Sequence, residues 1–201
     1  MIDYIATALG LPHLNPYLDR TASVQQGVNF AVAGSTLDTS FFTSRNITVT
    51  RLNRPLSVQL QWFRDHLIRT CRTPGACTQR LRRSLVFLGE VGGNDYNNAF
   101  FQHKPVEEIR SYVPQVVSGI TNAVRQVIHV GAVRVVVPGN FPIGCIPIYL
   151  TSFPSNDPSA YDDTNCLRSL NEFAVYHNDY LRGALPQLRR EYPRVVILYG
   201  D

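Results

Sequence analysis

Four short apolar segments constrain the fold of this sequence more than any other feature. Three of them are near-continuous apolar runs, the pattern of strands that are buried on both faces of a parallel sheet. The intervening residues 57–70, 106–130 and 166–192 carry apolar side chains at helical spacing. Strands that alternate with helices predict an α/β fold with a parallel sheet and right-handed crossovers. The four segments are VNFAVAG (28–34), SLVFLGE (84–90), AVRVVVPGN (132–140) and RVVILYGD (194–201).

Length and composition predict a single globular domain over residues 1–201. The chain has 201 residues, of which 44% are apolar and 17% charged, and it contains no linker, repeat or low-complexity tract. No stretch approaches the roughly 18 apolar residues of a membrane span. The net charge is +4 and the basic residues are spread along the chain, whereas nucleic-acid-binding proteins cluster them among stacking aromatic side chains. We therefore expect neither a membrane span nor nucleic-acid binding.

Prolines and glycines mark the expected helix ends. Residues 2–9 predict a short amphipathic helix that Gly10 and Pro12 end. A chain that opens inside a helix, without the basic segment of a secretory leader, is expected to have lost its beginning. Pro114 and Pro186 are expected to kink or shorten the helices that contain them.

The four cysteines form an even set in turn-rich surroundings. Their C-x5-C and C-x20-C spacings do not match zinc-binding pairs. Four cysteines can pair in three ways, and we favour Cys71–Cys77 with Cys145–Cys166 over four unpaired thiols in a reduced compartment. A loop of about 20 residues closed in this way would contribute roughly 3 kcal/mol. Together with the N-x-T sequon at Asn46, these pairs favour a secretory setting and a glycoprotein.

Glycines and polar residues gather where the predicted strands end. Gly34 ends the first segment and Asn94 follows the second, and ligands of open α/β sheets bind at the carboxyl ends of the strands. Alone, each residue also fits an ordinary loop, as a strand-end glycine or as a turn asparagine bonded to its own backbone. Together, a backbone N–H and a side-chain amide are the components of an oxyanion hole, which stabilises charge on an attacked carbonyl oxygen.

Four longer motifs resemble those of a known family, the plant GDSL esterase/lipases within the SGNH hydrolases. The resemblance covers nearly all 201 residues. It implies a flavodoxin-like, three-layer α/β/α fold, a secreted location, and serine-dependent hydrolysis of small-molecule or lipid carboxylic esters without a cofactor or metal. Within it, Gly34 would donate its backbone N–H and Asn94 its side-chain amide to the oxyanion. The motifs are GVNFAVAGST (27–36), GEVGGNDYNNAFF (89–101), VVVPGNFPIGCIPIYLT (135–151) and YHNDYLRGALPQLRREYP (176–193).

Two catalytic blocks of this family have no counterpart in the sequence. The family's nucleophile lies in an N-terminal Gly-Asp-Ser block and its base and orienting acid in a C-terminal Asp-x-x-His block, and neither pattern occurs. Ser35 lacks the strained elbow of G-x-S-x-G, and a serine without a positioned base is a weak nucleophile. We therefore nominate no replacement triad and expect a central segment of a GDSL-type hydrolase that is inactive by itself. The alternatives are a non-catalytic binding protein that keeps the carbonyl pocket, and a nucleotide-binding protein with GEVGGND as its glycine loop.

The missing N-terminal block would also carry a strand. By analogy with the flavodoxin strand order, this strand would lie between segments 28–34 and 84–90. Its absence would leave two unpaired strand edges, which favours association. We therefore expect a parallel sheet that lacks its first central strand, in a chain of undetermined oligomeric state.

Overall fold

The centre of the molecule is a parallel sheet of three strands, as seen in a computed structural model that describes residues 2–38, 40–49 and 54–201. The strands lie in the order β1 (Val86–Phe87), β2 (Arg134–Pro138) and β3 (Val196–Gly200). Val135 of the central strand lies opposite both Val86 and Ile197. The parallel sheet is therefore confirmed at three of the four apolar segments.

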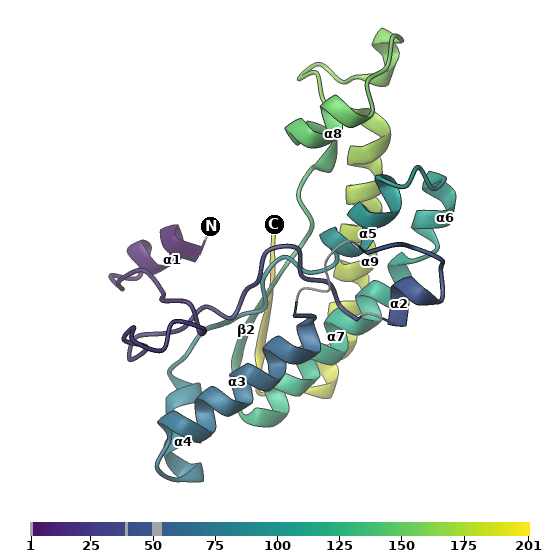
Figure 1. Ribbon diagram of the computed structural model, residues 1–201. Coiled ribbons are helices and arrows are strands. Elements are labelled where there is room, and N and C mark those ends of the chain that lie inside the picture. The colour runs from purple at the N-terminus through teal and green to yellow at the C-terminus, as the bar shows by residue number, and fades with distance from the viewer. Residues whose placement is uncertain (1, 39, 50–53) are drawn as a thin grey trace.

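Helices make up most of the remaining structure. The two crossovers run from β1 to β2 and from β2 to β3, and each contains one long helix, α7 and α9 respectively. Helix α3 contacts α7, and α7 contacts α9, so these three form a layer beside the sheet (Figure 1). A parallel sheet with helices packed around it is the arrangement of the three-layer α/β/α class. The helices are α1 (Ile2–Ala8), α2 (Ser40–Thr43), α3 (Leu56–Thr70), α4 (Pro74–Arg82), α5 (Gly93–Phe100), α6 (Val106–Arg110), α7 (Val113–Val130), α8 (Pro147–Ser152) and α9 (Arg168–Glu191), with 3₁₀ turns η1 (Ile143–Cys145) and η2 (Pro158–Ala160).

One apolar core joins the sheet to this helical layer. Val116 and Val124 of α7 and Leu181 and Leu185 of α9 are completely buried, because apolar residues three or four apart share one face of a helix. On the sheet side the core receives alternate residues of β2 and β3, while Val196 and Leu198 on the other face of β3 remain about half exposed. The edge strand is therefore buried on one face, rather than on both as its apolar run suggested. The core residues of the sheet are Val135, Val137 and Ile197.

The predicted strand at residues 28–34 is wrong. Within the described ranges its only ladder contact is one parallel bridge between Pro16 and Asn29, and Ala33 and Gly34 form a turn. An extended segment becomes a strand only where a neighbouring strand satisfies its backbone N–H and C=O groups. No described strand pairs with residues 28–34 or with the outer edge of β1. Residues 28–34 therefore form no continuous ladder of backbone hydrogen bonds.

The two helix-breaking prolines act in different ways. The helix predicted over 106–130 is divided into α6 and α7, and Pro114 lies in the first turn of α7. A proline is tolerated there because its missing N–H would have had no helical partner. Pro186 lies inside α9, which continues to Glu191, so this proline does not end the helix.

Both predicted disulfides are formed. The Cα atoms are 5.2 Å apart in Cys71–Cys77 and 4.5 Å apart in Cys145–Cys166, within the usual range. The first bond links the end of α3 to α4, and the second links η1 to the start of α9. Beside the second bond, a Cβ atom on Gly144 would lie only 2.2 Å from the carbonyl oxygen of Leu167. The close approach of these two backbones therefore requires glycine at position 144.

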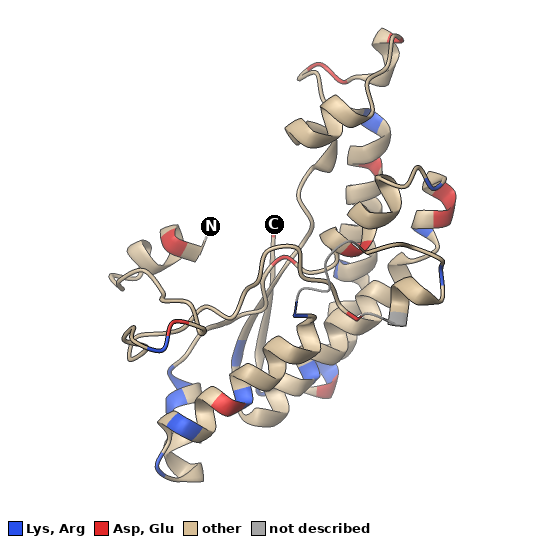
Figure 2. Cartoon of the chain, viewed as in Figure 1, with Lys and Arg blue, Asp and Glu red and all other residues tan. Residues whose placement is uncertain are grey.

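Figure 2 shows Lys, Arg, Asp and Glu distributed over many elements, with several basic positions close together around α4. In the part of the chain that the structure describes, no helix is both long and apolar enough to cross a membrane.

Candidate functional site

Gly34 lies in a tight turn before α2. The Ser35 N–H donates to the Val32 carbonyl oxygen at 3.1 Å, which closes the turn. Gly34 is its third residue and has a φ of +76°, a backbone conformation that glycine adopts at little cost. The Gly34 N–H donates to no acceptor within residues 2–38, 40–49 and 54–201. This N–H is therefore available to a ligand.

Asn94 lies in the first turn of helix α5, rather than in the loop expected from the sequence. Gly92 precedes the helix with a φ of +103°, and a Cβ atom there would lie 2.6 Å from Cγ1 of Val116. Glycine at this position lets the chain leave β1 and enter the helix directly against α7. The side chain of Asn94 is consequently held at the carboxyl end of β1, where ligands of parallel sheets bind.

The structure brings the two predicted site residues together. The side-chain amide of Asn94 donates from Nδ2 to the carbonyl oxygen of Ser35 at 2.8 Å, one residue away from Gly34. The amide is oriented by its other end, because Oδ1 of Asn94 accepts a hydrogen bond from Nδ2 of Asn97 at 3.2 Å. An amide nitrogen carries two hydrogens, so one N–H of Asn94 binds the turn and the second remains for a ligand.

The hydroxyl of Ser35 is engaged in structural hydrogen bonds. It donates to the Arg54 carbonyl oxygen at 2.8 Å and accepts from Nε2 of Gln59 at 2.6 Å. The partners of Ser35 in the described part of the chain include no histidine. Ser35 therefore has no base to activate it.

A group of buried ionisable side chains lies behind Asn94. Asp95 is completely buried, and burial raises its pKa to about 7. Burial also raises the pKa of Glu90, whose Oε1 accepts the Gly93 N–H at 3.2 Å. Tyr96 and His177 are joined by a 2.7 Å hydrogen bond from the tyrosine oxygen to Nδ1, and burial lowers the pKa of His177 to about 4. At neutral pH His177 is therefore uncharged.

Sequence reasoning missed this buried group. Asp95 follows Asn94 in the motif, but a turn aspartate and a buried one look the same in a single sequence. His177 was placed correctly on a helix, but nothing in its spacing indicated that it faces Tyr96. Across the described ranges, no group of three or more His, Cys, Asp or Glu residues is placed to hold a metal ion.

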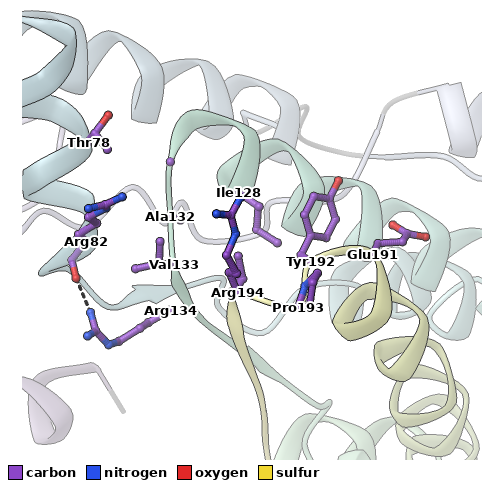
Figure 3. A pocket seen from close by; sticks show the side chains of 12 residues that line it. Thr78, Arg82, Ile128, Ala132, Val133, Arg134, Glu191, Tyr192, Pro193 and Arg194 are labelled. Atoms are coloured by element: carbon purple, nitrogen blue, oxygen red, sulfur yellow. Dashed lines mark hydrogen bonds between the residues drawn. The ribbon is translucent and has the colours of Figure 1, made fainter.

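A hollow lies at the opposite edge of the sheet. It has a volume of about 720 Å³ and is lined by residues at the amino ends of β2 and β3, including Arg134 and Arg194 (Figure 3). The Arg134 guanidinium donates to the carbonyl oxygen of Arg82 across one side of it. Neither Gly34 nor Asn94 lines this hollow, and reactions of α/β sheets take place at the carboxyl edge. We therefore assign the candidate site to the turn at Gly34 and the start of α5.

Comparison with known sequences identifies the family of the chain. The profile of the GDSL-like Lipase/Acylhydrolase family matches residues 1–201. The chain belongs to this family. The resemblance of the four motifs to this family and the expected α/β fold are therefore confirmed.

Two curated relatives illustrate the similarity of this chain to plant proteins. "GDSL esterase/lipase At5g03980" of Arabidopsis thaliana is 59% identical over 175 residues, which cover 87% of this chain and 54% of the relative. "Acetylajmalan esterase 1" of Rauvolfia serpentina is 46% identical over 202 residues, covering 100% of this chain and 52% of the relative. The chain thus spans about half the length of the curated relatives it matches.

Proposed function

We propose that residues 1–201 form the oxyanion-binding part of a GDSL-type carboxylic ester hydrolase. Gly34 supplies a backbone N–H and Asn94 a side-chain N–H to the oxygen of the attacked carbonyl group. The observation that carries the proposal is the 2.8 Å hydrogen bond from Nδ2 of Asn94 to the Ser35 carbonyl oxygen, because it ties the amide to the turn that presents the Gly34 N–H. Two donors held before the reaction stabilise a developing oxyanion without reorganisation.

The remaining catalytic groups are proposed to come from the family's two other blocks. A Gly-Asp-Ser block would supply the nucleophile, and an Asp-x-x-His block would supply the base that activates it. The substrate class that we propose is a small-molecule or lipid ester. Since relatives are named acetylajmalan esterases, acetyl esters are the first substrates to test.

Labelling with a serine-directed phosphonate tests this proposal. We define the extended protein as residues 1–201 placed between the flanking segments of acetylajmalan esterase 1 that would carry the family's Gly-Asp-Ser and Asp-x-x-His blocks. This protein is one of the relatives whose match covers the whole chain. The phosphonate should label the extended protein at the serine of the added block, and Ser35→Ala should be labelled equally, because the Ser35 hydroxyl is bonded to Arg54 and Gln59. Labelling at Ser35, or no labelling at all, would contradict the proposal.

A second candidate is a non-catalytic protein that binds carbonyl compounds. This candidate is favoured because the Ser35 hydroxyl is already hydrogen-bonded to Arg54 and Gln59. The turn at Gly34 then offers hydrogen-bond donors but no activated nucleophile. One measurement separates the two functions. If the second candidate is right, the extended protein would bind an acetyl ester without releasing the alcohol. Saturable binding with no turnover would favour this candidate.

We also propose a secreted, glycosylated protein. Two disulfides support an oxidising compartment, and the sequon residue Asn46 is exposed in a turn, with a φ of +54°. A single N-linked glycan at Asn46 should therefore be present after expression in plant cells. Treatment with a glycosidase for N-glycans should lower the mass of the protein by one glycan, and Asn46→Gln should show no change. An unglycosylated protein in the cytosol would contradict this prediction.

A further inference from the structure

We propose that Asp95 is a positioning residue of the oxyanion site, because its buried carboxyl group holds the backbone of residues 35–37 against helix α5. In this role Asp95 does not touch the substrate. It fixes the turn that carries the Gly34 N–H relative to the Asn94 amide. The inference rests on the proposed function for its catalytic meaning, whereas the anchoring itself can be tested without substrate.

Two consecutive residues of α5 bind the same short segment of backbone. Asn94 donates to the Ser35 carbonyl oxygen at 2.8 Å. Two residues further along, the Leu37 N–H donates to the Asp95 carboxyl group, with both oxygens 3.2 Å from the nitrogen. Asn94 binds a backbone carbonyl group of this segment and Asp95 binds a backbone N–H. Residues 35–37 therefore cannot move along α5 or rotate without breaking one of these hydrogen bonds. The orientation of the preceding turn is set by this pair of contacts.

The side chain of Leu37 provides a further restraint from the opposite side. A Cβ atom on Gly119 of α7 would lie 2.9 Å and 3.0 Å from the two terminal methyl carbons of Leu37. The leucine therefore packs directly on the bare backbone of α7, while its own N–H is held by α5. Between these anchors, the Thr36 carbonyl oxygen accepts the Leu56 N–H of α3 at 2.8 Å. Three helices thus fix residues 35–37.

The surroundings of Asp95 are unfavourable for a negative charge. Its side chain is completely buried, and burial raises its pKa to about 7, with a smaller increase from the nearby carboxylates of Glu90 and Asp38. The hydrogen bonds from the backbone of Leu37 and of Asp95 itself lower the pKa only in part. From α9, His177 faces the adjacent Tyr96 and is neutral, so it supplies no positive charge.

This burial gives Asp95 a defined effect on stability. Its pKa in the folded protein, about 7, lies above the value of 3.8 for an unperturbed aspartate. The contribution of this group to folding is therefore fully present below about pH 4 and is lost as the pH rises through about 7. Asparagine has a similar shape and offers the same type of acceptor without a charge. Asp95→Asn should thus keep the contact with Leu37 and remove the pH dependence.

Amide resonances of the 201-residue chain test the anchoring. With leucine labelled by ¹⁵N, the Leu37 amide should shift with pH, with a midpoint near 7, because its acceptor changes charge there. The resonance is assigned by its loss in Leu37→Met. In Asp95→Asn the pH-dependent shift should disappear, whereas Asp179→Asn, at an exposed position on α9, should leave it unchanged. A Leu37 amide with the same chemical shift in the unsubstituted chain and in Asp95→Asn at every pH would overturn the proposal.

Kinetics of the extended protein test the positioning. Asp95→Ala should lower kcat by about 10- to 100-fold, since a misplacement of about 1 Å can cost this much, with little change in KM. The concentration of competent sites is measured by phosphonate titration, so partial unfolding does not enter kcat. Asp95→Asn should restore kcat to nearly the unsubstituted value. An equal loss in both variants, or no loss in Asp95→Ala, would overturn the positioning role.

A second variant keeps the test valid if Asp95→Ala does not fold. Gly119→Ala leaves Asp95 intact and displaces Leu37 from the other side, because the added methyl group would meet the leucine at about 3 Å. It should also lower kcat per competent site, and an unchanged kcat would count against the proposal. If the extended protein hydrolyses no ester, the proposed function fails and the positioning role fails with it. The Leu37 titration distinguishes that result from a failure of the anchoring.

Discussion

Replacing Asn94 by alanine in the extended protein is expected to lower kcat by about 10²–10³-fold, the usual cost of losing one oxyanion donor. The amide of Asn94 is preoriented by its contacts with Ser35 and Asn97, so its second N–H meets the oxyanion without rearrangement. This hydrogen bond strengthens as charge develops on the oxygen, which is why KM should change little. The measurement is steady-state hydrolysis of p-nitrophenyl acetate, corrected for competent sites.

The matched control is Asn122→Ala on α7. Asn122 is exposed and its side chain bonds only to Arg125 among the described residues, so its replacement should leave kcat within about threefold, as surface substitutions usually do. Asn94→Asp should be as inactive as Asn94→Ala, because an ionised carboxylate offers no donor. Equal loss in Asn94→Ala and Asn122→Ala would indicate a general effect on folding and would contradict the oxyanion role.

Residues 1–201 by themselves are expected to hydrolyse short p-nitrophenyl esters no faster than their own Ser35→Ala variant. The Ser35 hydroxyl is already bonded to Arg54 and Gln59, and a hydroxyl without a base is a poor nucleophile. Adding the two family blocks should raise kcat on the order of 10³-fold or more, because loss of a complete triad costs about 10⁶ in a serine hydrolase. This is the largest effect that we expect.

Initial rates of both proteins, compared with buffer alone, decide this prediction. Oxyanion donors without a triad can still give roughly 10³-fold over water, so any residual rate of the bare chain should depend on Asn94 rather than on Ser35. Turnover that a serine-directed phosphonate abolishes in the bare chain would reveal a nucleophile within these residues and would refute the assignment.

The sequence predicted the short helix α1, the long helices α3, α7 and α9 and three strands, because apolar periodicity reports burial directly. It did not predict α2, α4, α5 and α8. The run at 132–140 became the central strand β2, and the helical spacing over 166–192 became α9. The run at 28–34 has a similar composition but no strand beside it, and pairing depends on a partner that a local pattern does not contain. The division between α6 and α7 was indicated by Pro114, which favours the first turn of a helix.

The site could be predicted only in part for a similar reason. Gly34 and Asn94 were found because they follow predicted strands and resemble family motifs, and the structure places them together. The binding of an oxyanion by Gly34 and Asn94 stays a prediction. The contribution of Asp95 depends on contacts with Leu37, 58 residues earlier in the chain, and on a glycine in α7 that leaves room for that leucine. Such contacts arise only after the helices pack, so no local pattern reveals them.

The two disulfides have a consequence for how the protein loses structure. They bind α4 and the region of α8, at opposite ends of the molecule (Figure 1), and they span only 6 and 21 positions of sequence. Neither connects one strand to another, so the sheet is held by backbone hydrogen bonds and apolar packing, without a covalent link between strands. Reduction should therefore release two peripheral loops as separate units of subglobal unfolding, while β1, β2 and β3 stay paired. The protein would become sensitive to proteases at residues 72–76 and 146–165 well before its centre melts.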